Sequence, residues 1–288
     1  MGQTGAVIAR LAACAAALAV LPGLLAGPAT ADPADPPGVL TIGPLTRTYV
    51  LHVPPGLDRP AGLVINLHGA GMTGADQAAL TNYNAVANQY GFVVAYPDGI
   101  DLSWADGRGA SVPDRDGVDD VGFLSALIER LSRDFAIPPR RVYVTGMSAG
   151  GFMANRMACD RADLVAAAAP VAGTLGAGVP CAPSQPVSML MMHGTADAVV
   201  PYAGGPMVGR GGPSEIVSAP ALANQWRQLD GCPGPLITQA AAGPVQRAAI
   251  GGCAGGTEVV LLTINDGPHI WPAALDASAA TAQFFAAH

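Results

Sequence analysis

A strand, a G-x-S-x-G turn and a helix follow one another in residues 141–158, and this succession constrains the fold more than any other feature. The apolar, β-branched run 141–145 predicts a buried strand, and residues 151–158 predict a helix. The two glycines of the pentapeptide allow a sharp turn between these elements. Ser148 is then held at the carboxyl end of the sheet, beside a helix N-terminus that favours developing negative charge. The pentapeptide alone also fits an ordinary turn, but the flanking strand and helix favour a nucleophile elbow.

A nucleophilic serine needs a base, which is usually an imidazole oriented by a carboxylate. In proteins with this elbow, the order along the chain is serine, acid, histidine. Asp197 follows the predicted strand 187–192, and His269 lies in the loop after the predicted strand 257–264. Because parallel strands end at one edge of a sheet, we predict Ser148 as nucleophile, Asp197 as acid and His269 as base.

Other roles for the polar residues remain open on the sequence alone. The position of Asp197 is also typical of a side chain that caps a turn, and that of His269 is also typical of a histidine packed within a loop. The rival carboxylates Asp119 and Asp120 precede the serine, and we interpret both as compensating the start of a helix. His52 is interpreted as a surface residue of an early strand.

A glycine-rich turn after an early strand supplies a candidate oxyanion hole. The buried run 63–67 leads into His68-Gly69-Ala70-Gly71, where a backbone N–H can point at the acyl oxygen. We predict the backbone N–H groups of Ala149 and Ala70 as the two donors. His68 is interpreted as a structural residue of this turn.

Six short motifs occur in an order that resembles one esterase family. The chain is similar, from about residue 38 onward, to the secreted polyhydroxybutyrate depolymerase and feruloyl or acetyl-xylan esterase family of α/β-hydrolases, which includes LpqC-type esterases. The resemblance implies the same triad and a loop of residues 103–109 near the acyl pocket. One departure is Ala70, where some members carry a cysteine. The motifs are Leu67-His68-Gly69, Tyr96-Pro97-Asp98-Gly99, Val118-Asp119-Asp120-Val121-Gly122-Phe123, Gly146-Met147-Ser148-Ala149-Gly150-Gly151, His193-Gly194-Thr195-Ala196-Asp197 with Val200-Pro201-Tyr202, and Gly267-Pro268-His269-Ile270-Trp271-Pro272.

The N-terminal segment is predicted to be a targeting signal. An apolar run follows Arg10, and Ala29-x-Ala31 fits cleavage before Asp32, so we assign residues 1–31 to a signal peptide. The run is short for a membrane span. Cys14 begins the apolar run instead of ending it, which disfavours a lipoprotein anchor. We predict a flexible lead-in over 32–38 and a single catalytic domain over 39–288, secreted or associated with the cell wall.

The alternation of strands and helices predicts an α/β-hydrolase fold, with a mostly parallel central sheet covered by helices on both faces. The strand at 47–53 is expected to be antiparallel, and the Gly/Pro-rich stretch 202–219 is a candidate rim or lid loop. The expected strands are 47–53, 62–67, 92–96, 141–145, 166–171, 187–192 and 257–264, and the expected helices are 75–89, 119–134, 149–158, 220–230 and 274–286.

Charge and cysteine content narrow the class of protein further. A net charge of −7 argues against nucleic-acid binding. Apart from Cys14 there are four cysteines, which allow three pairings in an oxidising compartment. We predict the sequence-local disulfides Cys159–Cys181 and Cys232–Cys253. The cysteine spacing does not favour a zinc site.

These features together predict a secreted serine esterase that acts through an acyl-enzyme and needs no metal or organic cofactor. We expect a monomer, and a small or oligomeric ester as substrate, either a short-chain hydroxyalkanoate or a feruloyl or acetyl ester. Trp104, Trp271 and Tyr202 are the candidate substrate-binding aromatics. Two alternatives remain, an acyltransferase with the same triad and a non-catalytic protein that binds cell wall or glycan. The complete triad argues against the second, because binding alone requires none of those residues.

Overall fold

The computed structural model describes residues 1–2 and 37–288. The predicted signal peptide, its cleavage site before Asp32 and Cys14 therefore lie outside the described residues, as do the first five residues of the predicted lead-in. The last two residues of that lead-in already belong to a strand, β1 (Pro37–Ile42). No helix within residues 37–288 has the length and apolar character needed to cross a membrane.

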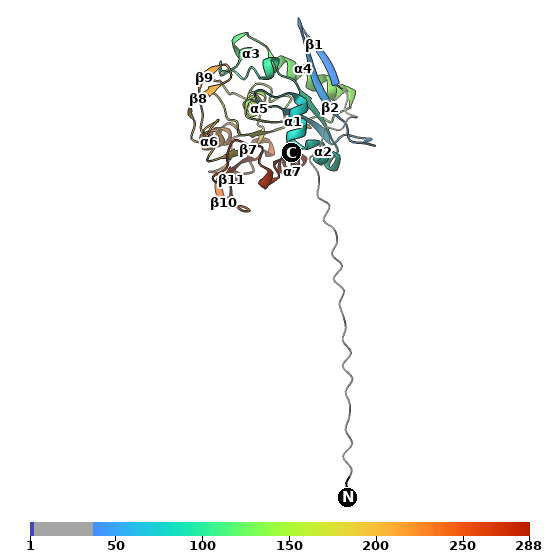
Figure 1. Cartoon of the computed structure of the whole chain (residues 1–288), viewed down its shortest axis with the longest axis vertical. Helices are drawn as coiled ribbons and strands as arrows, with labels where there is room; N and C mark the ends of the chain where they lie inside the picture. The colour runs from blue at the N-terminus through green and yellow to red at the C-terminus, as the bar shows by residue number, and fades with distance from the viewer. Residues whose placement is uncertain (3–36) are drawn as a thin grey trace.

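A ten-stranded sheet runs through the molecule in the order β1-β2-β4-β3-β5-β6-β7-β12-β11-β10. Figure 1 shows β1 and β2 at one side of the molecule and β10 and β11 at the opposite side. The six strands from β4 to β12 in that order are parallel, and the strands at both edges are antiparallel. This is the predicted α/β-hydrolase fold. The strands after β1 are β2 (Leu45–His52), β3 (Gly62–Leu67), β4 (Phe92–Pro97), β5 (Val142–Met147), β6 (Ala167–Val171), β7 (Ser188–Gly194), β10 (Ile237–Ala240), β11 (Val245–Ile250) and β12 (Val259–Ile264).

Helices cover both faces of this sheet, which explains why the central strands are continuously apolar. In β3, Leu63 and Ile65 face one hydrophobic core and Val64 faces the other. The first core is closed by α4 (Asp120–Asp134), α5 (Ala149–Asp160) and α6 (Ala219–Leu229). The second core is closed by α1 (Gly74–Thr81), α2 (Tyr83–Tyr90) and α7 (Ala277–Ala287).

Two predicted helices differ from the observed ones in detail. The helix expected over 75–89 is divided into α1 and α2 at Asn82, whose φ of +46° is left-handed and interrupts the helical path. The helix expected from residue 274 begins with a 3₁₀ turn (Ala273–Leu275), and α7 starts only at Ala277. The first predicted strand, β2, is antiparallel as expected to both of its neighbours, β1 and β4.

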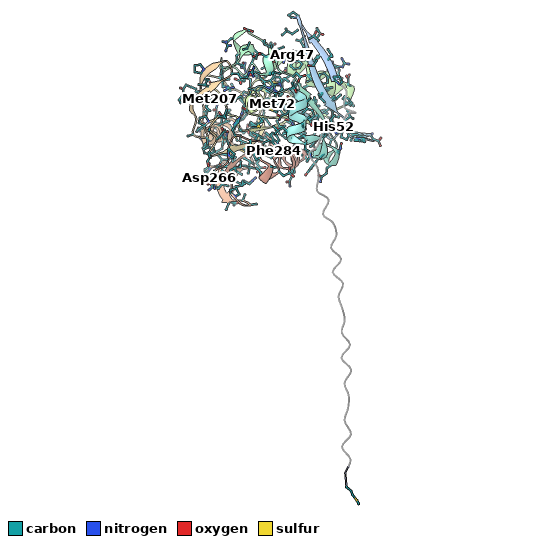
Figure 2. The ribbon with its side chains drawn as sticks, viewed as in Figure 1. Arg47, His52, Met72, Met207, Asp266 and Phe284 are labelled. Atoms are coloured by element: carbon teal, nitrogen blue, oxygen red, sulfur yellow. A yellow bond between two sulfur atoms is a disulfide. The ribbon has the colours of Figure 1, made fainter. Side chains whose placement is uncertain are left out.

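A small hairpin occupies the Gly/Pro-rich stretch that the sequence predicts to be a rim or lid loop. It consists of β8 (Gly205–Gly209) and β9 (Gly212–Ile216), and Figure 2 labels Met207 on it. The Gly211 N–H donates to the Ala110 carbonyl at 2.8 Å, and Glu215 accepts from the Ala177 N–H at 2.9 Å. These bonds tie the turn of the hairpin and the strand β9 to neighbouring loops.

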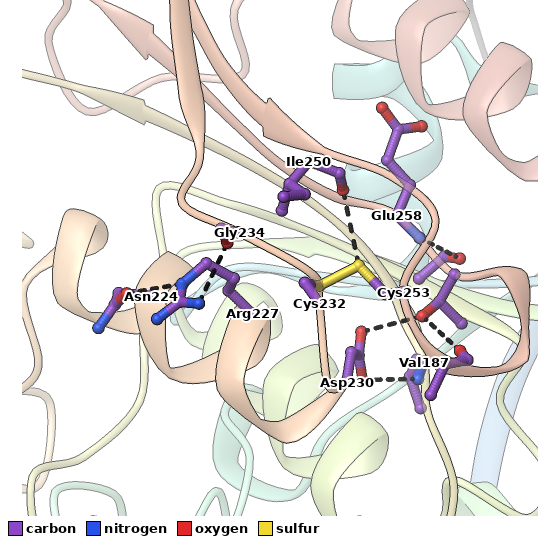
Figure 3. The surroundings of a disulfide bond; sticks show 12 residues. Val187, Asn224, Arg227, Asp230, Cys232, Gly234, Ile250, Cys253 and Glu258 are labelled. Atoms are coloured by element: carbon purple, nitrogen blue, oxygen red, sulfur yellow. Dashed lines mark hydrogen bonds between the residues drawn. A yellow bond between two sulfur atoms is a disulfide. The ribbon is translucent and has the colours of Figure 1, made fainter.

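Both predicted disulfides are present, Cys159–Cys181 and Cys232–Cys253. Figure 3 shows the second of them, at the end of α6, beside the fully buried Asp230. Asp230 accepts hydrogen bonds from the Val187 N–H and, at longer range, from the Thr257 hydroxyl. Burial raises the pKa of the Asp230 carboxyl to about 6, and these two bonds only partly oppose it.

Candidate active site

The G-x-S-x-G turn forms a tight elbow between β5 and α5. Ser148 has φ +56° and ψ −117°, a conformation that a serine adopts only under constraint. A Cβ at Gly150 would lie 2.1 Å from the Leu67 carbonyl oxygen, and one at Gly146 would lie 2.6 Å from the same atom. The elbow therefore requires glycine at both positions, because the chain here passes directly against β3.

Asp197 and His269 meet through a short hydrogen bond. His269 Nδ1 lies 2.7 Å from Asp197 Oδ2. The two residues come from the loops after β7 and β12, which are adjacent parallel strands and so end at the same edge of the sheet. If His269 donates through Nδ1–H, its Nε2 is left unprotonated and able to act as a base.

The Asp197 carboxylate is enclosed by donors. Oδ1 accepts from the backbone N–H groups of Val199 and Val200 at 2.9 and 2.8 Å. Burial alone would raise the pKa of Asp197, but hydrogen bonds from His193, His269 and the Val200 N–H outweigh it and hold that pKa well below its usual range. The side chain is thus a carboxylate at any pH at which the protein would work.

His193 begins one of the six sequence motifs, but no role was predicted for it from the sequence. Its side chain is buried, and its Nε2 lies 2.8 Å from the Val200 carbonyl oxygen and 3.4 Å from Asp197 Oδ2. The signal available in the sequence was the spacing of four residues between His193 and Asp197 across the end of β7.

A cavity of about 300 Å³ borders on two of the predicted catalytic residues and on both predicted oxyanion donors. Ser148, His269, Ala149 and Ala70 all contribute to its wall. The other lining residues are Ser103, Arg108, Ala110, Phe152, Val199, Met207, Val208, Gly209 and Arg210.

The oxyanion turn lies against the serine. A Cβ at Gly69 would be 3.7 Å from Ser148 Cβ, and the Gly71 N–H donates to the Leu102 carbonyl at 2.8 Å. His68 has the expected structural role, since its Nε2 accepts from the Gly99 N–H at 2.9 Å and its Nδ1 lies 2.8 Å from the Gly69 carbonyl oxygen. Burial lowers the pKa of His68, which favours the neutral ring that these bonds require.

The three predicted substrate-binding aromatics do not line this cavity. Trp104 is fully buried and donates its indole N–H to the His68 carbonyl at 2.9 Å. Trp271 is buried against Ser278, and the Tyr202 hydroxyl lies 2.9 Å from Thr263 Oγ1. These contacts favour supporting roles, and Phe152 and Met207 supply the large apolar side chains of the wall.

The rival polar residues have structural partners. Asp119 caps α4 as expected, accepting from the Gly122 N–H at 2.7 Å. Our interpretation of Asp120 as a residue of the helix start was incomplete, because its buried carboxylate pairs with Arg47 at 2.8 Å. His52 was wrongly assigned to the surface. It is 3% exposed, and its Nε2 lies 2.8 Å from Asn88 Oδ1.

Comparison with known proteins gives one family. A model of the family described as Esterase PHB depolymerase matches residues 47–225. Feruloyl esterase B of Piromyces equi is 31% identical over 234 residues, which cover 77% of this chain and 42% of that protein. The putative esterase NocK of Nocardia uniformis subsp. tsuyamanensis is 30% identical over 79% of this chain and 71% of its own length. The chain thus spans less than half of the first of these relatives.

Solved structures share the fold. An acetyl xylan esterase from Aspergillus awamori superposes with a TM-score of 0.62, covering 86% of this chain and 99% of that one, at 18% identity. At this identity the likeness bears on architecture alone.

Proposed function

Because the chain belongs to the PHB depolymerase family of esterases, we propose that it is a secreted serine esterase that hydrolyses carboxylic esters through an acyl-enzyme. The observation that carries the proposal is the 2.7 Å contact between His269 Nδ1 and Asp197 Oδ2, beside a cavity that His269 shares with Ser148. This is the arrangement that an imidazole base requires.

Each residue of the site has a separate role in the proposed reaction. His269 takes the proton of the Ser148 hydroxyl as the serine attacks the ester carbonyl, and then gives that proton to the departing alcohol. Asp197 holds the ring orientation and stabilises the imidazolium. The backbone N–H groups of Ala149 and Ala70 stabilise the oxyanion. Water, activated by His269, then releases the acid from Ser148.

The size and lining of the cavity support the substrate class that we propose. A wall with Phe152 and Met207 suits a short acyl or aryl group, and a volume of about 300 Å³ admits one residue of an oligomer at a time. We propose short-chain hydroxyalkanoate, feruloyl or acetyl esters as substrates. Two disulfides support an oxidising compartment and hence secretion.

The test is turnover of 4-nitrophenyl acetate and butyrate by the mature chain, followed by labelling with a fluorophosphonate. The proposal requires turnover, and it requires one covalent adduct located at Ser148. A folded protein that neither cleaves these esters nor takes up the label would contradict it. Added alcohol acceptors separate hydrolysis from acyl transfer, because a transferase releases the acyl group mainly as a new ester.

A further inference from the structure

The charges in the wall of the Ser148 cavity are unusual for this chain. Its lining residues include two arginines, Arg108 and Arg210, and neither an aspartate nor a glutamate. The chain as a whole has a net charge of −7, so two arginines without a carboxylate in this wall differ in sign from the overall charge and would attract an anion to the cavity.

The Arg108 guanidinium is held in place by several contacts, but one of its nitrogens contacts a sulfur in place of an oxygen acceptor. Its Nε and Nη2 bind the two oxygens of Asp106 at 2.9 and 2.7 Å, and its guanidinium lies 3.5 Å over the ring of Phe152. The third nitrogen, Nη1, contacts the Met207 sulfur at 3.3 Å. A thioether is a weak acceptor, so an oxygen in the cavity would be a better partner for Nη1.

Arg210 brings a second guanidinium over the mouth of the cavity. It lies at the tip of the β8–β9 hairpin, and its Nη1 is 3.3 Å from the position of a Cβ at Gly71, next to the oxyanion turn. Its ion pair with Asp101 is long, at 3.9 Å, and both side chains are nearly half exposed. Such a pair is weak, so the charge of Arg210 is available to another anion.

We propose that the ester substrate carries a free carboxylate, which Arg210 binds with the Nη1 group of Arg108 as a second donor. This inference rests on the proposed function and names the substrate class more closely. It fits half-esters of dicarboxylic acids and oligomers of hydroxy acids that end in an acid group. Guanidinium and carboxylate match in shape and charge, and a neutral ester would leave both arginines without this partner.

Two pairs of soluble esters that differ only in the carboxylate provide the test. In mono-4-nitrophenyl glutarate the carboxylate lies on the acyl side of the ester bond that is cleaved, and the methyl ester is its neutral control. In 3-acetoxybutyrate the carboxylate lies on the alcohol side, and the methyl ester is again the neutral control. We expect KM to be about tenfold lower for the anionic member of at least one pair, which identifies the side. In Arg210→Gln this preference should fall about tenfold, and Arg210→Lys should retain part of it.

A matched control and a salt series complete the design. Arg133→Gln removes the same charge from an exposed site on α4, and it should leave the preference unchanged. In the wild-type protein, 0.5 M salt should raise KM for the anionic ester alone, since exposed charges are screened at about this concentration. Turnover of neutral esters without an anionic preference, or with a preference that Arg210→Gln does not reduce, would overturn the inference and leave the proposed function intact. Failure to cleave any ester would contradict both.

Discussion

His193 Nε2 lies 3.4 Å from Asp197 Oδ2, the same oxygen that His269 Nδ1 contacts at 2.7 Å. Two imidazoles thus share one carboxylate oxygen, while two backbone N–H groups occupy the other. The edge of the His193 ring is also fixed by the Val200 carbonyl and by a T-shaped contact with Tyr202. We interpret His193 as a positioning residue that fixes the Asp197 carboxylate for His269.

Replacement of His193 should therefore reduce kcat more than it changes KM. His193→Ala removes one of the hydrogen bonds that lower the pKa of Asp197, and a bond to a charged group contributes about 1.5–3 kcal/mol. A loss of about ten- to hundredfold in kcat is expected. His193→Gln keeps an N–H near the position of Nε2 and should restore part of that loss. Steady-state kinetics on 4-nitrophenyl butyrate with all three proteins decides the matter, and a wild-type kcat in His193→Ala would refute the positioning role.

Asp197 and Asp120 are both buried and should respond in opposite ways to replacement by asparagine. Asp197→Asn should lower kcat by about 10⁴-fold with little effect on folding, because the amide no longer orients the His269 ring. Asp120→Asn should leave the activity of the folded protein largely unchanged, but it leaves Arg47 without its charged partner and should cost about 3–5 kcal/mol of stability. Kinetics and urea unfolding of both variants test this. Loss of catalysis in Asp120→Asn alone would reverse our assignment of the acid.

Both disulfides should contribute to stability. Each closes a loop of similar size, with sequence separations of 22 and 21 residues, for which the chain-entropy model gives about 3 kcal/mol. Mass spectrometry of the unreduced mature chain should find no free thiol, and the Cys232→Ser/Cys253→Ser double variant should unfold at lower urea concentration. Two or more thiols that alkylate without reduction would contradict the pairing.

Asp230 should make stability depend on pH between about 4 and 6. Its folded pKa of about 6 lies above the unfolded value, so the folded state binds the proton more tightly and its stability falls as pH rises through this window. A shift of about two units corresponds to about 3 kcal/mol. The asparagine of Asp230→Asn cannot ionise, so the variant avoids this penalty. Its free energy of unfolding should exceed that of the wild type by up to about 3 kcal/mol at pH 7. At pH 4 the two free energies should be nearly equal.

Urea unfolding at several pH values measures this difference. Asp58→Asn, at an exposed loop position, is the matched control and should show no such gain. A difference between Asp230→Asn and wild type that does not change between pH 4 and 7 would show that Asp230 is ionised without penalty.

The central part of the fold is predictable because its signals are local. The strand before Ser148 is a continuous apolar run, and the glycines at 146 and 150 report the close passage of the Leu67 carbonyl. The hairpin containing Met207 has no such signal, because its glycines and prolines obscure the alternation of apolar and polar residues that marks a strand. Its position also depends on hydrogen bonds to loops that are distant in the sequence. β10 was missed for a related reason, because all four of its residues are exposed.

The same distinction applies to the site. Ser148, Asp197 and His269 could be named because chain order and strand ends bring them to one edge. The roles of Arg108 and Arg210 depend on contacts between segments far apart in sequence, such as that of Arg108 with Met207, 99 residues away. Trp104 was expected at the substrate because it is aromatic, but its indole N–H is satisfied in the core.

The central claim is that Ser148 is the nucleophile, and the kcat of Ser148→Ala on 4-nitrophenyl butyrate tests it most directly. The side chain is partly exposed at the cavity, so its truncation should leave the fold and the melting temperature nearly unchanged. We predict that kcat falls by about 10⁶-fold, as in other triads that lose their serine. A folded Ser148→Ala protein with a kcat within about tenfold of wild type would contradict the account.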